Sequence, residues 1–148
     1  MTHSPQTVLF LCTGNYYRSR FAEELFNHLA AAAEISWRAD SRALAIERGV
    51  ANFGPMSQHT IAALKHRGIK PVEPMRFPQP LKESDLKDAG LVIALKEAEH
   101  RPLMQERFAA YADQVDYWHV HDLDCAAPQE ALTEVEQQVR ELLQRLAR

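Results

Sequence analysis

The amino-acid sequence predicts an α/β fold with a parallel sheet whose two faces are covered by helices. The first observation is alternation, because segments with strand character are separated by segments with apolar residues at helical spacing. The second is the run over residues 91–95, which is apolar throughout, as expected of a strand buried on both faces. The third is the length of 148 residues, which suits one domain over residues 1–148.

The N-terminal half of the chain is expected to contain two strands and two helices. Residues 8–12 are apolar and predict a buried strand, and residues 35–41 alternate like a strand with one covered face. Ser57 can cap a later helix, which Gly68 is expected to end. The helix between the two strands is predicted from apolar residues at helical spacing: Phe21, Ala22, Leu25, Phe26 and Leu29.

The C-terminal half adds an extended connection, two strands and two helices. Four prolines between residues 71 and 80 predict a connection that is too short to join separate domains. Residues 91–95 should form a central strand, followed by a helix over roughly residues 97–111 and a last strand over residues 115–120. The final helix is expected to pack against the sheet through an apolar stripe: Leu132, Val135, Val139, Leu142 and Leu146.

The most informative segment joins the first predicted strand to the first predicted helix. Cys12 ends the apolar run, and five residues separate it from Arg18. At a helix N-terminus, unpaired backbone N–H groups and the helix dipole favour an anion, and an arginine fork can grip two phosphate oxygens. A thiolate in this place is suited to attack on phosphorus. The segment therefore predicts covalent catalysis by Cys12, whereas the alternative is a buried structural cysteine.

The residues between Cys12 and Arg18 support the catalytic interpretation. No proline lies between Thr13 and Ser19, so every backbone N–H there can donate to an anion. Gly14 tolerates the unusual backbone angles that a tight anion-binding turn requires. Asn15 can tie the loop together through its side chain, and the Ser19 hydroxyl can donate to the thiolate.

With Gly14, Asn15 and Ser19 in place, the segment from Cys12 to Ser19 resembles the signature of the low-molecular-weight protein tyrosine phosphatases. The resemblance implies a four-stranded parallel sheet with helices on both faces and a phosphate-binding loop after the first strand. It also implies hydrolysis of a phosphomonoester through a cysteinyl-phosphate intermediate. Protein phosphotyrosine is the first candidate substrate, and no metal or organic cofactor is expected.

Other functions stay open within this resemblance. Relatives that begin the loop with the same four residues act on phosphoarginine or reduce arsenate. The reductases need further cysteines to resolve a cysteine–arsenic adduct, and no cysteine lies between Cys12 and Cys125, which argues against that activity. A weakly catalytic phosphate-binding or regulatory relative is the remaining alternative, because the proline and the cleft tyrosines that usually follow the acid are missing after Asp122.

The resemblance assigns three catalytic residues. Cys12 is the nucleophile, Arg18 binds the phosphoryl group, and Asp122 is the general acid that protonates the leaving oxygen and then deprotonates the attacking water. Asp124 is the second candidate for the acid. The substrate-binding positions are the other residues of the loop: Thr13, Gly14, Asn15, Tyr16, Tyr17 and Ser19.

Four further residues are interpreted from their positions relative to the family. Ser41 takes the place of a serine that is often near the phosphate loop, and is considered a supporting residue only. Tyr17 takes the place of a second cysteine that many relatives carry, and Cys125 is expected to be passive. Tyr16 lies where relatives carry a residue that helps to choose the substrate, so its ring is expected to line the cleft mouth or to pack in the space of the missing tyrosines.

Composition argues against several other classes of function. The net charge of -3 offers no electrostatic case for binding nucleic acid or an acidic membrane. Residues 1–6 lack the apolar stretch of a signal peptide, and no segment is long enough to span a bilayer. The two cysteines favour a reducing cytoplasm.

Two histidines near the predicted acid suggest a metal cluster at first sight. His119 and His121 share one face of the predicted strand, close to Asp122 and Asp124. Their spacing matches no common metal site of a hydrolase, so no metal is expected. The expected partner is a phosphorylated protein or a small aryl phosphate, and the expected state is a monomer or a weak dimer.

Overall fold

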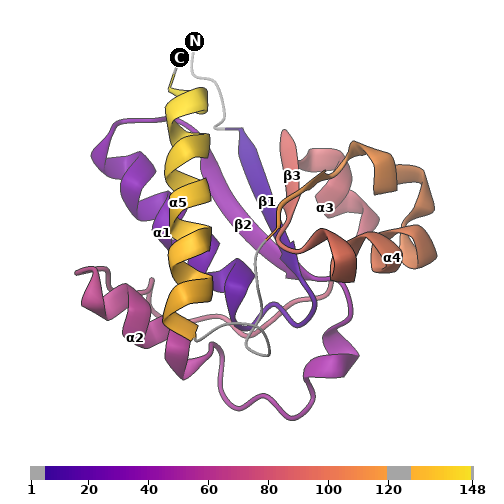
Figure 1. Ribbon diagram of the computed structural model, residues 1–148, viewed down its shortest axis with the longest axis horizontal. Helices are drawn as coiled ribbons and strands as arrows, with labels where there is room; N and C mark the ends of the chain where they lie inside the picture. The colour runs from indigo at the N-terminus through magenta and orange to yellow at the C-terminus, as the bar shows by residue number, and fades with distance from the viewer. Residues whose placement is uncertain (1–5, 120–127, 148) are drawn as a thin grey trace.

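The computed structural model describes residues 6–119 and 128–147, which form a parallel sheet with helices on both of its faces (Figure 1). The strands are neighbours in the order β2-β1-β3-β4, and every neighbouring pair is parallel. The predicted α/β class and the four-stranded parallel sheet are therefore confirmed. The strands are β1 (Thr7–Cys12), β2 (Arg38–Ala43), β3 (Leu91–Ala94) and β4 (Asp116–Tyr117).

The helices divide between the two faces of the sheet. Figure 1 shows α1, α2 and α5 on one side and α3 and α4 on the other. Right-handed crossovers between parallel strands place helices on both faces in this way. The α-helices are α1 (Arg18–Ala32), α2 (Gln58–His66), α3 (Glu83–Asp88), α4 (Glu97–Arg107) and α5 (Pro128–Leu146), with 3₁₀ helices η1 (Ile46–Gly49) and η2 (Ala109–Gln114).

Strand β1 supplies side chains to both layers of the core. Val8 and Phe10 belong to the cluster that includes α1 and α5, and Leu9 and Leu11 belong to the cluster that includes α3 and α4. This alternation follows from the two-residue period of a strand, and all four side chains are almost fully buried. The Phe10 ring also packs edge-on against Phe26 of α1, with 6.1 Å between ring centroids. Strand β1 is thus held rigidly from both sides.

The helix signals in the sequence are largely confirmed. The Ser57 side chain accepts a hydrogen bond of 3.1 Å from the backbone N–H of His59 and so caps α2. Gly68 follows this helix with a φ of 73°, a left-handed conformation that suits glycine. The apolar stripe of α5 is confirmed as well, because Leu132 and Val139 lie in the same core cluster as Phe10.

The predicted strand over residues 35–41 begins too early. Helix α1 ends in a turn in which Glu34 adopts a φ of 57° and the backbone N–H of Ile35 donates to the Ala30 carbonyl at 2.9 Å. Ile35 therefore packs against the core as part of the helix end. Strand β2 starts three residues later, at Arg38.

Three further elements differ from prediction. The helix expected over residues 97–111 ends at Arg107, and the chain continues through Phe108 into η2. Of the predicted last strand over residues 115–120, the described part, which ends at residue 119, contains only the two strand residues of β4. Helix α3 was not predicted, because its six residues bury only Leu86 and give no apolar stripe.

The sheet places the carboxyl ends of β1 and β3 side by side. Cys12 ends β1 and is paired with Ala43 of β2, while the backbone N–H of Leu95, just after β3, donates to the Leu11 carbonyl at 3.1 Å. Helices α1 and α4 begin at this same edge. In parallel α/β sheets, ligands bind at the carboxyl ends of the strands.

Candidate active site

Cys12 lies at the carboxyl end of β1, at the start of the loop over residues 12–19, called the cysteine loop below. The residue is 3% exposed, and its Sγ is 2.9 Å from the Oγ of Ser19 in the first turn of α1. Ser19 itself is fully buried. The fold thus presents one thiol with one hydroxyl held against its sulfur.

The Ser19 hydroxyl is held against the thiol by the side chain of Asn15. The Asn15 Nδ2 group donates to Ser19 Oγ and to Ser41 Oγ, each at 2.8 Å. Either atom can donate while Cys12 is a thiol, but a thiolate sulfur has no proton, so in the ionised state the Ser19 hydroxyl is the donor. A hydroxyl that donates to sulfur stabilises a thiolate.

The amide orientation of Asn15 is set by two further donors. Its Oδ1 accepts from Arg76 Nη1 at 3.0 Å and from the backbone N–H of Gln79 at 3.2 Å. Asn15 is fully buried and has a φ of 52°, a left-handed conformation that asparagine tolerates. The prediction had given the unusual backbone angle to Gly14; the left-handed residue of the cysteine loop is Asn15 instead.

Ser41 extends the network to a partly buried ion pair. Its hydroxyl donates to Glu23 Oε1 at 2.5 Å, and Arg76 Nη2 lies 2.9 Å from the same carboxylate oxygen. Burial raises the pKa of Glu23 above its ordinary value, against the opposing effects of Arg76 and Ser41. The supporting place suggested for Ser41 is thus observed as a direct contact with Asn15. Arg76 was missed, because it lies in the proline-rich connection and belongs to no local motif.

Arg18 is nearly buried beside the thiol and pairs with a residue that the sequence did not suggest. Its Nη2 atom is 3.3 Å from Oε2 and 3.4 Å from Oε1 of Glu99, in the first turn of α4. The Thr13 hydroxyl donates to the same carboxylate. Burial acts to raise the pKa of Glu99, but the Arg18 charge and the Thr13 hydrogen bond outweigh it and hold this pKa below its ordinary value.

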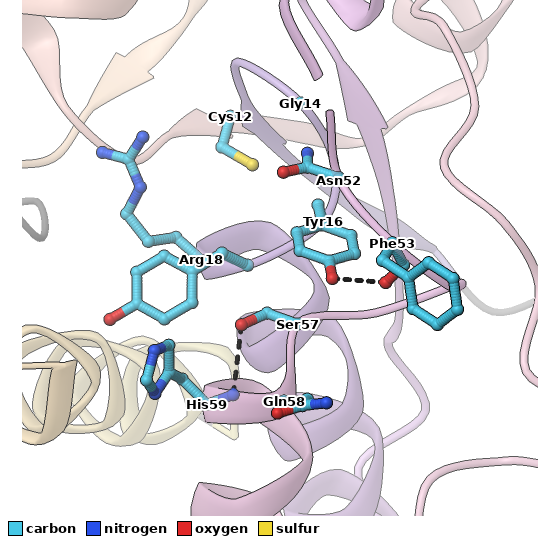
Figure 2. Close-up of a pocket in the computed structure, with 10 residues that line it drawn as sticks. Cys12, Gly14, Tyr16, Arg18, Asn52, Phe53, Ser57, Gln58 and His59 are labelled. Atoms are coloured by element: carbon cyan, nitrogen blue, oxygen red, sulfur yellow. Dashed lines mark hydrogen bonds between the residues drawn. The ribbon is translucent and has the colours of Figure 1, made fainter. Parts of the chain in front are cut away.

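A cavity of about 440 Å³ opens over the cysteine loop. Figure 2 shows the Cys12 sulfur facing this space, with the Arg18 guanidinium on one side and Tyr16 and Phe53 on the other. The Tyr16 hydroxyl donates to the Phe53 carbonyl at 2.5 Å. The lining is built from the cysteine loop and the segment that leads into α2: Cys12, Gly14, Tyr16, Tyr17, Arg18, Asn52, Phe53, Ser57, Gln58 and His59.

Tyr17 forms part of the wall between the cysteine loop and α2. Its ring packs edge-on against His59, with 6.4 Å between centroids, and its backbone carbonyl accepts from the Thr60 hydroxyl at 2.9 Å. Burial raises the pKa of the Tyr17 hydroxyl to about 12, although the Arg18 charge acts to lower it. The phenol therefore stays protonated at neutral pH.

The structure brings most of the predicted site residues together. Six of the eight positions from Cys12 to Ser19 line the cavity or contact the thiol directly, whereas Asn15 holds the loop from beneath and Thr13 turns its hydroxyl to Glu99. Asp122 and Asp124 lie outside the described residues, as do His121 and Cys125. The segment 52–59 was missed, because nothing in its local sequence indicates proximity to Cys12.

Neither a metal cluster nor a membrane-spanning helix occurs in the part of the chain that the structure describes. Within residues 6–119 and 128–147, no group of three or more His, Cys, Asp or Glu side chains is placed to hold a metal ion. In the same part of the chain, every helix is too short or too polar to cross a bilayer.

Comparison with known proteins gave consistent matches. The family model described as "low molecular weight phosphotyrosine protein phosphatase" matches residues 7–148. The chain is 29% identical over 110 residues to the protein-arginine-phosphatase of Bacillus subtilis, covering 73% of this chain and 67% of that protein.

Solved structures resemble the chain over nearly its whole length. A low molecular weight protein tyrosine phosphatase from T. tengcongensis matches with a TM-score of 0.78 and 26% identity, covering 95% of this chain and 99% of the other. The YwlE arginine phosphatase from Geobacillus stearothermophilus matches with a TM-score of 0.75 and 23% identity, covering 97% and 94%. The second likeness concerns the fold alone.

Proposed function

The chain belongs to the low molecular weight phosphotyrosine protein phosphatase family, whose members are cysteine-dependent phosphatases, and on this premise we propose how its residues act. Cys12 is the nucleophile, and Arg18 and the amides of the cysteine loop bind the phosphoryl group. The observation that carries the proposal is the 2.9 Å contact between Cys12 Sγ and Ser19 Oγ, beside a cavity that Arg18 also lines.

In the first step, the Cys12 thiolate attacks phosphorus while the bond from phosphorus to the leaving oxygen breaks. The Arg18 fork follows two of the phosphoryl oxygens into the transition state, where their charge is spread over the equatorial plane. The leaving oxygen needs a proton, and Asp122 is proposed to supply it. This assignment rests on the family resemblance, since Asp122 lies outside the described residues.

In the second step, water attacks the cysteinyl phosphate, the sulfur–phosphorus bond breaks, and inorganic phosphate leaves. The water proton passes to the carboxylate that donated in the first step, and Cys12 departs as a thiolate. Ser19 donates to this departing sulfur, because a thiolate carries no proton and can only accept. The network under the cysteine loop thus assists both halves of the reaction.

The walls of the cavity favour phosphotyrosine as the substrate. The aromatic residues Tyr16 and Tyr17 are among those that line a space of about 440 Å³, and aryl leaving groups pack well against aromatic rings. Phosphoarginine is the second candidate, supported by the 29% identity to a protein-arginine-phosphatase and by the affinity of aromatic faces for guanidinium groups.

A panel of matched phosphopeptides tests the substrate. Peptides that differ only in carrying phosphotyrosine, phosphoarginine or phosphoserine are compared by phosphate release, and kcat/KM is expected to be highest for phosphotyrosine. A higher kcat/KM for phosphoarginine would replace the proposed substrate with the second candidate. Turnover on none of the three, with phosphate still bound, would mean that the chain is a phosphate-binding relative.

The remaining expectations stay predictions. They are one domain over residues 1–148, catalysis without metal or organic cofactor, a monomeric or weakly dimeric state, and a cytoplasmic location. The substrate-binding roles of Thr13, Gly14, Asn15, Tyr16, Tyr17 and Ser19 are proposed on the same grounds as those of Cys12 and Arg18.

A further inference from the structure

Glu99 joins α4 to both ends of the cysteine loop through one carboxylate. Its oxygens lie 3.3 and 3.4 Å from Nη2 of Arg18, and Oε1 accepts the hydroxyl proton of Thr13. Thr13 directly follows the thiol, and Arg18 begins α1, so the two contacts span the loop. The carboxylate comes from a helix 81 residues further along the chain than Arg18.

Glu99 is not one of the residues that line the cavity over the cysteine loop. Arg18 is among the residues that line the cavity, whereas the described lining contains neither Glu99 nor Thr13. Glu99 thus contacts Arg18 without being one of the residues that line the cavity. Its side chain is 29% exposed, against 9% for that of Arg18, so the pair closes the buried cation off from solvent on that side.

The charges around Glu99 favour an ionised carboxylate that forms an ion pair with Arg18. A buried guanidinium needs a partner, because taking an unpaired charge out of water is costly. The neighbouring His100 is fully buried, and burial together with the Arg18 charge lowers its pKa to about 3, so it is neutral. Its Nδ1 accepts from the backbone N–H of Lys96 at 3.0 Å, and its Nε2 is 3.9 Å from Glu99. Arg18 is thus the cation that Glu99 holds most closely.

We propose that Glu99 is a positioning residue for the reaction, which holds Arg18 and the Thr13 end of the cysteine loop in the geometry that the transition state requires. The proposal rests on the proposed function in that it assigns phosphate binding to Arg18. It has a specific consequence, because one carboxylate has two effects of opposite sign. Its negative charge weakens the attraction of Arg18 for a ground-state phosphate dianion, while its contacts order the guanidinium for the trigonal-bipyramidal state.

The test compares two oxyanions and turnover in the full chain. Inorganic phosphate serves as the ground-state probe and vanadate as the probe of trigonal-bipyramidal geometry. The main variant is Glu99→Gln, which keeps the side-chain shape and an oxygen acceptor for Thr13 but removes the charge. The matched control is Glu97→Gln in the same turn of α4, where Glu97 is exposed and pairs with Arg101 at 2.8 Å.

Glu99→Gln is expected to lower kcat at least 10-fold with KM unchanged or lower. Phosphate should bind as tightly as in the wild type or more tightly, while vanadate should bind at least 10-fold more weakly. Glu97→Gln should leave all four quantities within about twofold, since its ion pair lies on the surface. Glu99→Asp, which keeps the charge on a shorter side chain, should recover part of the lost kcat.

Three results would overturn the proposal. Tighter binding of both oxyanions with an equal or higher kcat in Glu99→Gln would make Glu99 a competitor of the substrate. Equal losses in the Glu97 and Glu99 variants would assign the effect to the charge of α4 as a whole. A lowered melting temperature with unchanged phosphate and vanadate affinities in the folded protein would leave Glu99 a purely structural role.

The oxyanion measurements do not depend on turnover. If the wild type fails to hydrolyse any phosphopeptide, the proposed function fails. The ratio of vanadate to phosphate affinity, compared between Glu99→Gln and the wild type, still tests whether Glu99 positions Arg18. Should Glu99→Gln not fold, Glu99→Asp carries the test, and an unchanged affinity ratio in that variant together with wild-type kcat would refute the proposal.

Discussion

Replacing Ser19 by Ala should slow the second half of the reaction more than the first. The Ser19 hydroxyl is the group held 2.9 Å from the Cys12 sulfur, and Asn15 holds its oxygen in place by a hydrogen bond of 2.8 Å. Without it, the departing thiolate loses its closest described hydrogen-bond donor. In the first step, the same loss leaves the attacking thiolate with one donor fewer and therefore more nucleophilic, so this step should slow less.

The expected size follows from the nature of the bond. A hydrogen bond to a charged group contributes about 1.5–3 kcal/mol, and about 1.4 kcal/mol is a factor of ten in rate. Hydrolysis of the cysteinyl phosphate at Cys12 should therefore slow by about 10- to 150-fold. Because Ser19 is fully buried, the substitution also leaves one Asn15 donor without its acceptor, which should lower stability by about 1 kcal/mol.

The assay is rapid-quench turnover of an activated aryl phosphate. Ser19→Ala should show a burst of released phenol of about one equivalent, followed by a slow steady state, and the phosphorylated enzyme should accumulate. Ser41→Ala is the matched control, because Ser41 is equally buried and also accepts from Asn15 at 2.8 Å, yet contacts Glu23 instead of the thiol. A steady-state rate for Ser19→Ala within twofold of the wild type, or equal losses in both serine variants, would refute the reasoning.

Three other predictions concern the cation, the acid and an ion pair remote from the site. Arg18→Lys should lose at least about 2 kcal/mol of transition-state stabilisation, or about 30-fold in kcat/KM, because a point charge cannot grip two oxygens; full activity would place the phosphate elsewhere. Asp122→Asn should cut hydrolysis of phosphotyrosine by about 10²–10⁴ and that of an activated aryl phosphate by less, and a larger loss in Asp124→Asn would reverse the two assignments. Glu136 accepts from Arg67 at 2.7 Å, and although burial acts to raise the pKa of Glu136, its arginine partners hold that pKa below the ordinary value. At pH values above the unfolded carboxyl pKa of about 4.3, the pair should therefore stabilise the fold by about 1 kcal/mol, and this stabilisation should be lost as the pH falls through the folded pKa of Glu136. The free energies of unfolding of Glu136→Gln and the wild type, measured by chemical denaturation, should therefore converge at acid pH. A constant difference between them from pH 7 to pH 3 would contradict the pairing.

The sequence predicted those helix and strand boundaries that depend on residues close together in the chain. The cap at Ser57 and the stop at Gly68 act within one turn of helix, so they could be predicted from neighbouring residues alone. The same reasoning failed at Ile35, whose apolar side chain closes the end of α1 and looks in the sequence like the first residue of a strand.

The residues of the site likewise fall into those that local sequence reveals and those that only the fold brings to the site. The nucleophile and Arg18 could be found because the cysteine loop is continuous in sequence. Arg76 and Glu99 reach that loop from 61 and 81 residues away, and only the sheet order and the start of α4 at its carboxyl edge bring them there. A carboxylate in the first turn after β3 was the one available hint for Glu99, since that turn lies at the same edge as Cys12.

The central claim is that phosphate passes through the sulfur of Cys12, and trapping the intermediate tests it most directly. Wild-type protein is mixed with an aryl phosphate and quenched within one turnover under conditions that preserve thiophosphate bonds. Peptide mass spectrometry should then find one phosphoryl group on Cys12, and Cys12→Ser should release no phosphate catalytically while still binding vanadate or phosphate at the cysteine loop. Turnover near the wild-type rate in Cys12→Ser, or a phosphoryl group trapped on any other residue, would contradict the account.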